Sequence, residues 1–184
     1  MDCMNYICKT ITILSALVMM SCSTGDFLDK EITYEYEPEW AAAYYLGSEG
    51  ELSNYKLVLT AGRPDEEENL ISGGAILTLM LNAPTRDVID LPDGRYQASA
   101  TKGMAYTFDY GLELDGSAIE GSFVTTRLPG TKNIYSYPLD KGDVYVVVEE
   151  DGDYRVKAEV GTESYDFEFL YDGRLMTFNL TSPF

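Results

Sequence analysis

Residues 154–171 carry the clearest structural pattern in the chain: Tyr154-Arg-Val-Lys-Ala-Glu-Val160, then Gly-Thr-Glu-Ser, then Tyr165-Asp-Phe-Glu-Phe-Leu-Tyr171. In the first stretch every second residue is apolar and the residues between are charged. In the second stretch every second residue is aromatic. Because successive side chains of a β-strand point to opposite faces, this alternation predicts two half-buried strands. The short connection at Gly161 predicts that they form a hairpin.

Turn signals on both sides extend the hairpin into a longer antiparallel pattern. The apolar run at residues 144–148 is followed by Asp151-Gly152, a dipeptide that favours a type I′ turn, and Asp172-Gly173 precedes a further apolar run at residues 175–180. Four consecutive strands with short turns predict a meander. Upstream, turn signals recur roughly every eight to twelve residues, as in all-β domains. Further candidate strands lie at residues 41–46, 55–60, 75–82, 96–101, 106–110 and 119–127.

We therefore expect an all-β fold, an antiparallel β-sandwich or barrel-like meander of about ten strands. Residues 39–184 form a single β domain in this interpretation. Residues 93–110 and 151–169 share one order of residue types: an Asp-Gly turn, a strand that begins with Tyr, a second turn and an aromatic-alternating strand. A duplicated hairpin would explain this likeness. The repeated use of Asp-Gly turns and Tyr-rich strands in antiparallel proteins would explain it equally well.

Composition and charge exclude several classes of protein. The chain has 184 residues and 45% hydrophobic residues, enough to build one core and too many for a disordered chain. Its 31 acidic and 13 basic residues give a net charge of −18, which repels phosphate backbones and excludes sequence-independent nucleic-acid binding. The chain has no histidine, so neither an imidazole base nor an imidazole metal ligand is available.

The first 21 residues are expected to be an export signal. Lys9 precedes an apolar run at residues 11–20, which is half of the roughly 20 residues that a membrane-spanning helix needs. The stretch Val18-Met-Met-Ser-Cys22 resembles the lipobox of bacterial lipoproteins, which implies lipid attachment at Cys22 after cleavage. The residue that follows, Ser23, resembles those of lipoproteins delivered to the outer membrane. A non-lipidated signal peptide that ends nearby is the alternative.

Residues 22–38 are polar and acidic, and we expect them to be a tether with one short strand at residues 32–36. Cys3 and Cys8 would be discarded with the leader and Cys22 would carry the lipid, so no thiol would remain for catalysis or for a metal.

The order of the turn-and-strand motifs resembles that of envelope lipoproteins of Bacteroidota. The motifs are Leu91-Pro-Asp-Gly94-Arg-Tyr96, Gly142-Asp-Val-Tyr-Val, Gly152-Asp-Tyr154-Arg-Val and Tyr171-Asp-Gly173-Arg-Leu175. The resemblance spans most of residues 40–180 and implies a β-sandwich or β-barrel envelope lipoprotein. It carries no catalytic residue across.

The sequence predicts no cofactor and no catalytic residue. It has no Walker-type or GxGxxG loop. Of the 31 acidic residues only Asp2 precedes Cys22, and the 30 that follow make a chance carboxylate pair unavoidable. The acidic runs at residues 140–143 and 149–153 do not have the ligand spacing of a calcium loop, and we interpret them as solvated turns.

Aromatic residues are the remaining candidates for binding. Trp40, Tyr44 and Tyr45 lie where the tether meets the domain, and flat apolar rings suit the faces of sugars. We therefore expect a non-enzymatic, outer-membrane-anchored lipoprotein that binds a glycan or an envelope protein. The alternatives are an accessory hydrolase with a carboxylate-lined cleft and a strand-exchanging subunit of a surface assembly.

Overall fold

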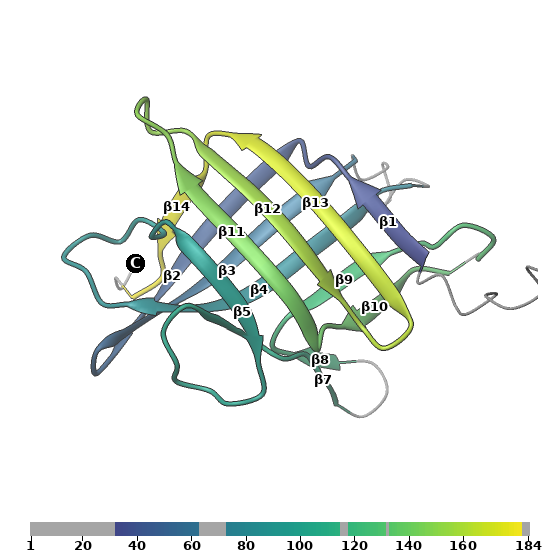
Figure 1. Ribbon diagram of the computed structural model, residues 1–184, viewed down its shortest axis with the longest axis horizontal. Helices are drawn as coiled ribbons and strands as arrows, with labels where there is room; N and C mark the ends of the chain where they lie inside the picture. Colours follow the sequence, from purple (N-terminus) through teal and green to yellow (C-terminus); the bar gives the residue numbers. More distant parts are fainter. Residues whose placement is uncertain (1–31, 63–72, 115–117, 132, 182–184) are drawn as a thin grey trace, which may run out of the picture. The chain divides into compact units, whose positions relative to one another are not determined.

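The structure is a computed structural model that describes residues 32–62, 73–114, 118–131 and 133–181. Every regular element in these residues is a strand, so the expected all-β fold is confirmed (Figure 1). The described residues contain no helix with the length and hydropathy needed to cross a membrane. The strands are β1 (Ile32–Tyr36), β2 (Trp40–Glu49), β3 (Leu52–Ala61), β4 (Ala75–Pro84), β5 (Gly94–Ser99), β6 (Thr107–Asp109), β7 (Leu112–Leu114), β8 (Ala118–Glu120), β9 (Phe123–Thr126), β10 (Tyr135–Pro138), β11 (Lys141–Val148), β12 (Tyr154–Gly161), β13 (Tyr165–Gly173) and β14 (Met176–Asn179).

Twelve of the described strands belong to one mixed sheet, and β7 and β8 form a small second sheet. The long path through the sheet runs β1-β13-β12-β11-β5-β6-β4-β3-β2-β14, and β9 joins β10 to β4. In Figure 1 the strands β11, β12 and β13 lie in front of β2, β3 and β4. The sheet thus curls so that its two halves face each other, and the buried apolar side chains of both halves meet in one core.

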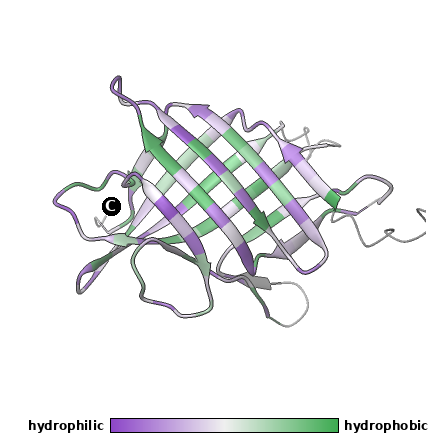
Figure 2. Cartoon of the chain, viewed as in Figure 1, coloured by the Kyte–Doolittle hydropathy of each residue, from purple (hydrophilic) through white to green (hydrophobic). Residues whose placement is uncertain are grey.

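The strands β11, β12 and β13 form the predicted antiparallel meander. Eight residue pairs join β11 to β12, and eight more join β12 to β13. Val156, Ala158 and Val160 are buried on the core side of β12, as their alternation with charged residues predicts. Figure 2 shows the same alternation as bands of hydrophilic and hydrophobic residues along the front strands.

The prediction of a purely antiparallel sheet is wrong, because both ends of the sheet pair in parallel. β14 does not continue the meander beside β13; it crosses to the other half and pairs in parallel with β2. The place beside β13 is taken by β1, also in parallel. Tyr34 and Tyr36 of β1 stack on Phe167 and Phe169 of β13, with ring centroids 5.9 and 4.9 Å apart. Residues 32–36, which the sequence assigned to the tether, therefore form the short strand that was expected there. This aromatic packing holds that strand against the sheet.

The hypothesis of a duplicated hairpin, one of the two explanations for the likeness of residues 93–110 and 151–169, is also wrong. β12 and β13 are antiparallel, but β5 and β6 are parallel and pair over only three residues. Tyr106 has a φ of 57°, and its ring covers Gly94: a Cβ there would lie 2.5 Å from Tyr106 Cε1. The backbone of Tyr106 also bonds to both neighbouring strands, its N–H to the Asn82 carbonyl at 2.8 Å and its carbonyl to the Gln97 N–H at 3.0 Å. The left-handed turn at Tyr106 therefore redirects the second strand.

Candidate functional site

The outer surface of β14, β2, β3 and β4 carries the most distinctive group of side chains. The core-facing residues of these strands include Ala41, Ala43 and Leu57, which are buried, so their neighbours in sequence point outward. In the register of the sheet, Phe178 lies beside Tyr44, Tyr44 lies opposite Lys56, and Lys56 lies opposite Met80. One row of outward side chains thus crosses four strands. We call the exposed Trp40, Met176 and Phe178, together with the half-buried Tyr44, the aromatic face.

The aromatic face presents near-parallel rings to the exterior. The rings of Tyr44 and Phe178 have centroids 5.2 Å apart and planes inclined by 18°. Trp40 is 37% exposed and Phe178 is 42% exposed, so both keep apolar area accessible. Lys56 places its Nζ 6.0 Å from the centre of the Tyr44 ring, within reach of a cation–π interaction. Large exposed rings on adjacent strands are typical of a binding surface.

The structure brings together two of the three aromatic residues singled out from the sequence. Trp40 and Tyr44 share the outer surface of β2. Tyr45, as the next residue in the strand, points to the core side, where its ring lies 5.5 Å from that of Tyr55 and its hydroxyl hydrogen-bonds Ser48 at 2.7 Å. Phe178 occupies the aromatic face where Tyr45 was expected. No local pattern in the sequence connects Phe178 with Tyr44. Cys22 lies outside the described residues.

A polar pocket adjoins the aromatic face. It has a volume of about 470 Å³, and its lining includes Asn54, Asn82, Lys102 and Asp109. Asn54 and Asn82 lie directly opposite each other on β3 and β4. Met80 lines the pocket and also belongs to the row that contains Tyr44, so the pocket opens on the same outer surface as the aromatic face, with Lys56 between them. We call it the Asn82 pocket.

The amide of Asn82 is held in a defined orientation. It is buried, and its Nδ2 donates hydrogen bonds to Asp109 Oδ1 at 2.8 Å and to Thr107 Oγ1 at 3.3 Å. At the rim, Lys102 forms an ion pair with Glu120 at 2.9 Å. Amide, carboxylate and ammonium groups close to exposed rings supply the donors and acceptors that ligand hydroxyls need.

The outer surface of β5, β11, β12 and β13 differs in kind, because opposite charges are paired across its strands. We call it the ion-paired face. Hydrogen bonds from Arg95 hold the pKa of Asp143 below its usual range. Tyr145 is also 37% exposed there, with the Arg95 guanidinium 5.6 Å from its ring centre. The ion pairs on this face include Arg95 with Asp143 at 2.8 Å, Lys141 with Asp166 at 3.0 Å, Arg155 with Asp172 at 3.1 Å and Lys157 with Glu159 at 2.6 Å.

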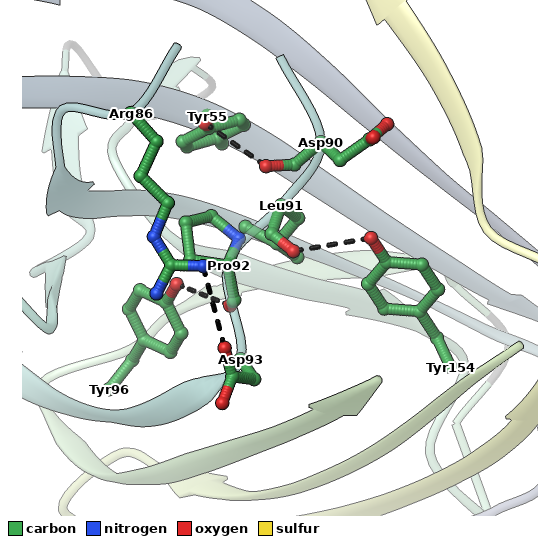
Figure 3. A network of polar contacts seen from close by, with 8 residues as sticks. All are labelled: Tyr55, Arg86, Asp90, Leu91, Pro92, Asp93, Tyr96 and Tyr154. Atoms are coloured by element: carbon green, nitrogen blue, oxygen red, sulfur yellow. Dashed lines mark hydrogen bonds and ion pairs between the residues drawn. The ribbon is translucent and has the colours of Figure 1, made fainter. Parts of the chain in front are cut away.

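The Leu-Pro-Asp-Gly-Arg-Tyr motif has a structural role (Figure 3). Three tyrosines from three strands donate hydrogen bonds to three consecutive carbonyls of this loop. The bonds run from Tyr55 to the Asp90 carbonyl at 3.3 Å, from Tyr154 to the Leu91 carbonyl at 3.2 Å and from Tyr96 to the Pro92 carbonyl at 2.8 Å. Leu91 is 1% exposed, and burial raises the pKa of Tyr96 well above its usual value. The motif thus fastens a loop to the core.

The acidic run at residues 149–153 forms an open hollow with Asp172 around Arg155. Arg155 binds Glu149 Oε1 at 3.2 Å as well as Asp172. Across residues 32–62, 73–114, 118–131 and 133–181, no three acidic, cysteine or histidine side chains are grouped to hold a metal ion. The arginine at the centre of the hollow already neutralises part of the charge that would attract a cation.

Comparison with protein-family models, with curated proteins and with solved structures finds no match for this chain.

Proposed function

We propose that this protein is a non-enzymatic, outer-membrane-anchored lipoprotein that binds a glycan through the aromatic face and the Asn82 pocket. The observation that carries the proposal is the near-parallel pair formed by the half-buried Tyr44 and the exposed Phe178, with Trp40 on the same surface. The C–H face of a pyranose ring packs against such rings, while its hydroxyls need hydrogen-bonding groups of the kind in the adjoining pocket. The curled sheet serves, in this proposal, as a sandwich-like scaffold.

The charge of the chain favours a neutral glycan at this site. A net charge of −18 repels polyanions, and Asp109 and Glu49 contribute two carboxylates to the lining of the Asn82 pocket. Neutral hydroxyls can accept from Lys102 and donate to those carboxylates without that repulsion. We therefore expect hexose or N-acetylhexosamine polymers to bind better than sulfated or phosphorylated ones.

The binding test uses the full chain, purified in detergent, on a panel of neutral and acidic glycans. The best ligand is then titrated by calorimetry against Trp40→Ala and Tyr145→Ala. Both residues are aromatic and 37% exposed, but Tyr145 lies on the ion-paired face. We expect the affinity to fall about tenfold in Trp40→Ala and to stay unchanged in Tyr145→Ala. Equal losses in both variants, or no glycan bound, would contradict the proposal.

The lipid anchor at Cys22 is a separate part of the proposal. Residues 22–31 separate it from β1, and ten residues span at most about 35 Å. The anchor would therefore hold the domain close to the membrane. Cys22→Ala is expected to move the protein from the membrane fraction to the soluble fraction of cells. Continued membrane retention of that variant would refute the anchor.

Three other functions lead to different outcomes. An envelope protein as the partner predicts that Trp40→Ala abolishes a cross-link to one defined membrane protein while no glycan binds. A strand-exchanging subunit predicts pairing at a free sheet edge, but the end strands β1 and β14 have only five and four residues. Short edge strands oppose strand addition. An accessory hydrolase predicts turnover of a bound glycan, which product analysis of the same mixtures would reveal.

A further inference from the structure

A further cavity lies beside β1, where the chain leaves β9. It has a volume of about 350 Å³, and its described lining includes Tyr34, Tyr36, Arg127, Leu128 and Pro129. None of these residues belongs to the aromatic face or to the Asn82 pocket. We call it the Arg127 cavity.

The guanidinium of Arg127 is the unusual feature of this cavity. Its Nε is buried and has no hydrogen-bond acceptor among the described residues. In a chain with 31 acidic residues this is unexpected, because carboxylates are plentiful. A buried charged donor that reaches neither an acceptor nor water is unfavourable. The other arginines of the described segments each form an ion pair: Arg86 with Asp93, Arg95 with Asp143, Arg155 with Asp172 and Arg174 with Asp153.

The walls of the cavity are already fixed by other contacts. The Thr126 hydroxyl donates to the Gly74 carbonyl at 2.8 Å, so Tyr36 donates its own hydroxyl proton to Thr126 Oγ1 at 3.1 Å. Tyr34 stacks on Phe167. Neither tyrosine is therefore committed to Arg127, and their rings form a rigid, mainly apolar wall.

Glu35 also lines the cavity, but it lies between the two tyrosines in β1. Because successive residues of a strand point to opposite faces, its side chain projects away from the surface that Tyr34 and Tyr36 form. In the register it lies beside Glu168, which is within 3.6 Å of Lys157. Among the described lining residues, Arg127 is therefore the charged group on the tyrosine side of the cavity.

We propose that the Arg127 cavity binds a small organic acid through a single carboxylate. A guanidinium edge and a carboxylate match in planar, two-bond geometry, so a small rotation of Arg127 would let a ligand satisfy its Nε. The net charge of −18 penalises a dianion more than a monoanion. The tyrosine rings, Leu128 and Pro129 favour a carbon or sugar-ring body over a bare inorganic ion. The cavity volume suits a molecule of monosaccharide or amino-acid size.

The test is a calorimetric titration of the full chain in detergent with two carboxylates from different sources. Glucuronate represents an acidic sugar, and N-acetylglycine represents a peptide carboxyl end. Glucose and inorganic phosphate are the controls for the neutral ring and for a dianion. We expect millimolar or tighter binding of at least one carboxylate, at least about tenfold weaker binding of glucose and phosphate, and loss of about tenfold or more in Arg127→Gln.

Further variants separate this site from the glycan site and from misfolding. Arg127→Lys keeps the charge but loses the planar fork, so it should retain part of the affinity. Trp40→Ala should bind the carboxylate as the wild type does, whatever its effect on glycans. If Arg127→Gln fails to fold, as judged by circular dichroism, the comparison uses Arg127→Lys against the wild type. The proposal is overturned if no carboxylate binds below about 10 mM, if glucose or phosphate binds as tightly, or if affinity does not change in the folded Arg127 variants.

Discussion

The aromatic face and the ion-paired face belong to the two halves of one curled sheet, yet their outward residues have opposite characters. On the ion-paired face, Lys157 lies 2.6 Å from Glu159 and 3.6 Å from Glu168. On the aromatic face, Lys56 instead lies over the ring of Tyr44. The same residue type therefore pairs with acidic neighbours on one half and lies over the half-buried ring of Tyr44 on the other. Apolar side chains are exposed on both faces, as Tyr145 and Leu170 show for the ion-paired face. The stacked rings of Tyr44 and Phe178 therefore distinguish the aromatic face, rather than exposed apolar area alone.

The largest difference between the two faces is expected in glycan affinity, when a charge is placed on each face in turn. Phe178→Lys sets a cation beside Tyr44 and close to Lys56, and we expect glycan affinity to fall by about tenfold to a hundredfold. Leu170→Lys is the matched control, because Leu170 is 48% exposed on β13. We expect no change in affinity in that variant. Calorimetric titration measures both, and an equal response of the two variants would remove the functional distinction between the faces.

The buried amide next to the aromatic face should contribute to stability, unlike a charge on the opposite face. Asn82→Ala removes both hydrogen bonds to Asp109 and Thr107, and we expect a loss of about 1–3 kcal/mol in the free energy of unfolding. Glu159→Ala on the ion-paired face should change it by less than about 0.5 kcal/mol. Urea denaturation followed by circular dichroism tests this. If Asn82→Ala is as mild as Glu159→Ala, the Asn82 network does not stabilise the fold.

Acidic pH should reduce the contribution of the ion-paired face to the stability of the fold. The pKa of Asp143 is lower in the folded chain than in the unfolded chain, so its contribution to stability is complete above the unfolded value of about 3.9 and is lost as the pH falls through the folded value. Both partners are partly exposed, which keeps the contribution below about 1 kcal/mol. Asp143→Asn should therefore reduce the loss of stability below about pH 4. Urea denaturation across acidic pH measures it, and an unchanged pH profile would contradict the assignment.

Salt should produce the smallest difference between the faces. Raising NaCl from about 0.05 M to about 1 M screens the exposed pairs of Lys157, and we expect only a small decrease in the free energy of unfolding. Lys157→Met should reduce that salt response. Glycan affinity at the aromatic face should stay nearly constant over the same range, because stacking does not depend on ionic strength. A glycan affinity that falls steeply with salt would indicate charge recognition instead.

The sequence predicted the strands better than it predicted their partners. Turn dipeptides and alternation located β3, β4, β11, β12 and β13, because these signals act within a few residues of chain. They did not locate β7 or β10, which have three and four residues. Such short strands contain too few residues for an alternating pattern to stand out.

The candidate site was predicted in part. Trp40 and Tyr44 were identified as candidate binding residues, and Tyr45 was grouped with them although strand alternation places it on the core side. Phe178, the Asn82 pocket and the unpaired Nε of Arg127 were not anticipated. Each arises where segments distant in the sequence meet, and a single sequence carries no signal for such meetings.

Alternation along the chain is a local property of extended backbone, so the sequence by itself established the all-β class and assigned most side chains to one side of a strand or the other. Which strands become neighbours depends instead on the packing of many distant residues. The tyrosines of β1 stack on β13, and β14 crosses to lie beside β2. The tertiary structure alone therefore placed Phe178 next to Tyr44 and created the surface on which the proposed function rests.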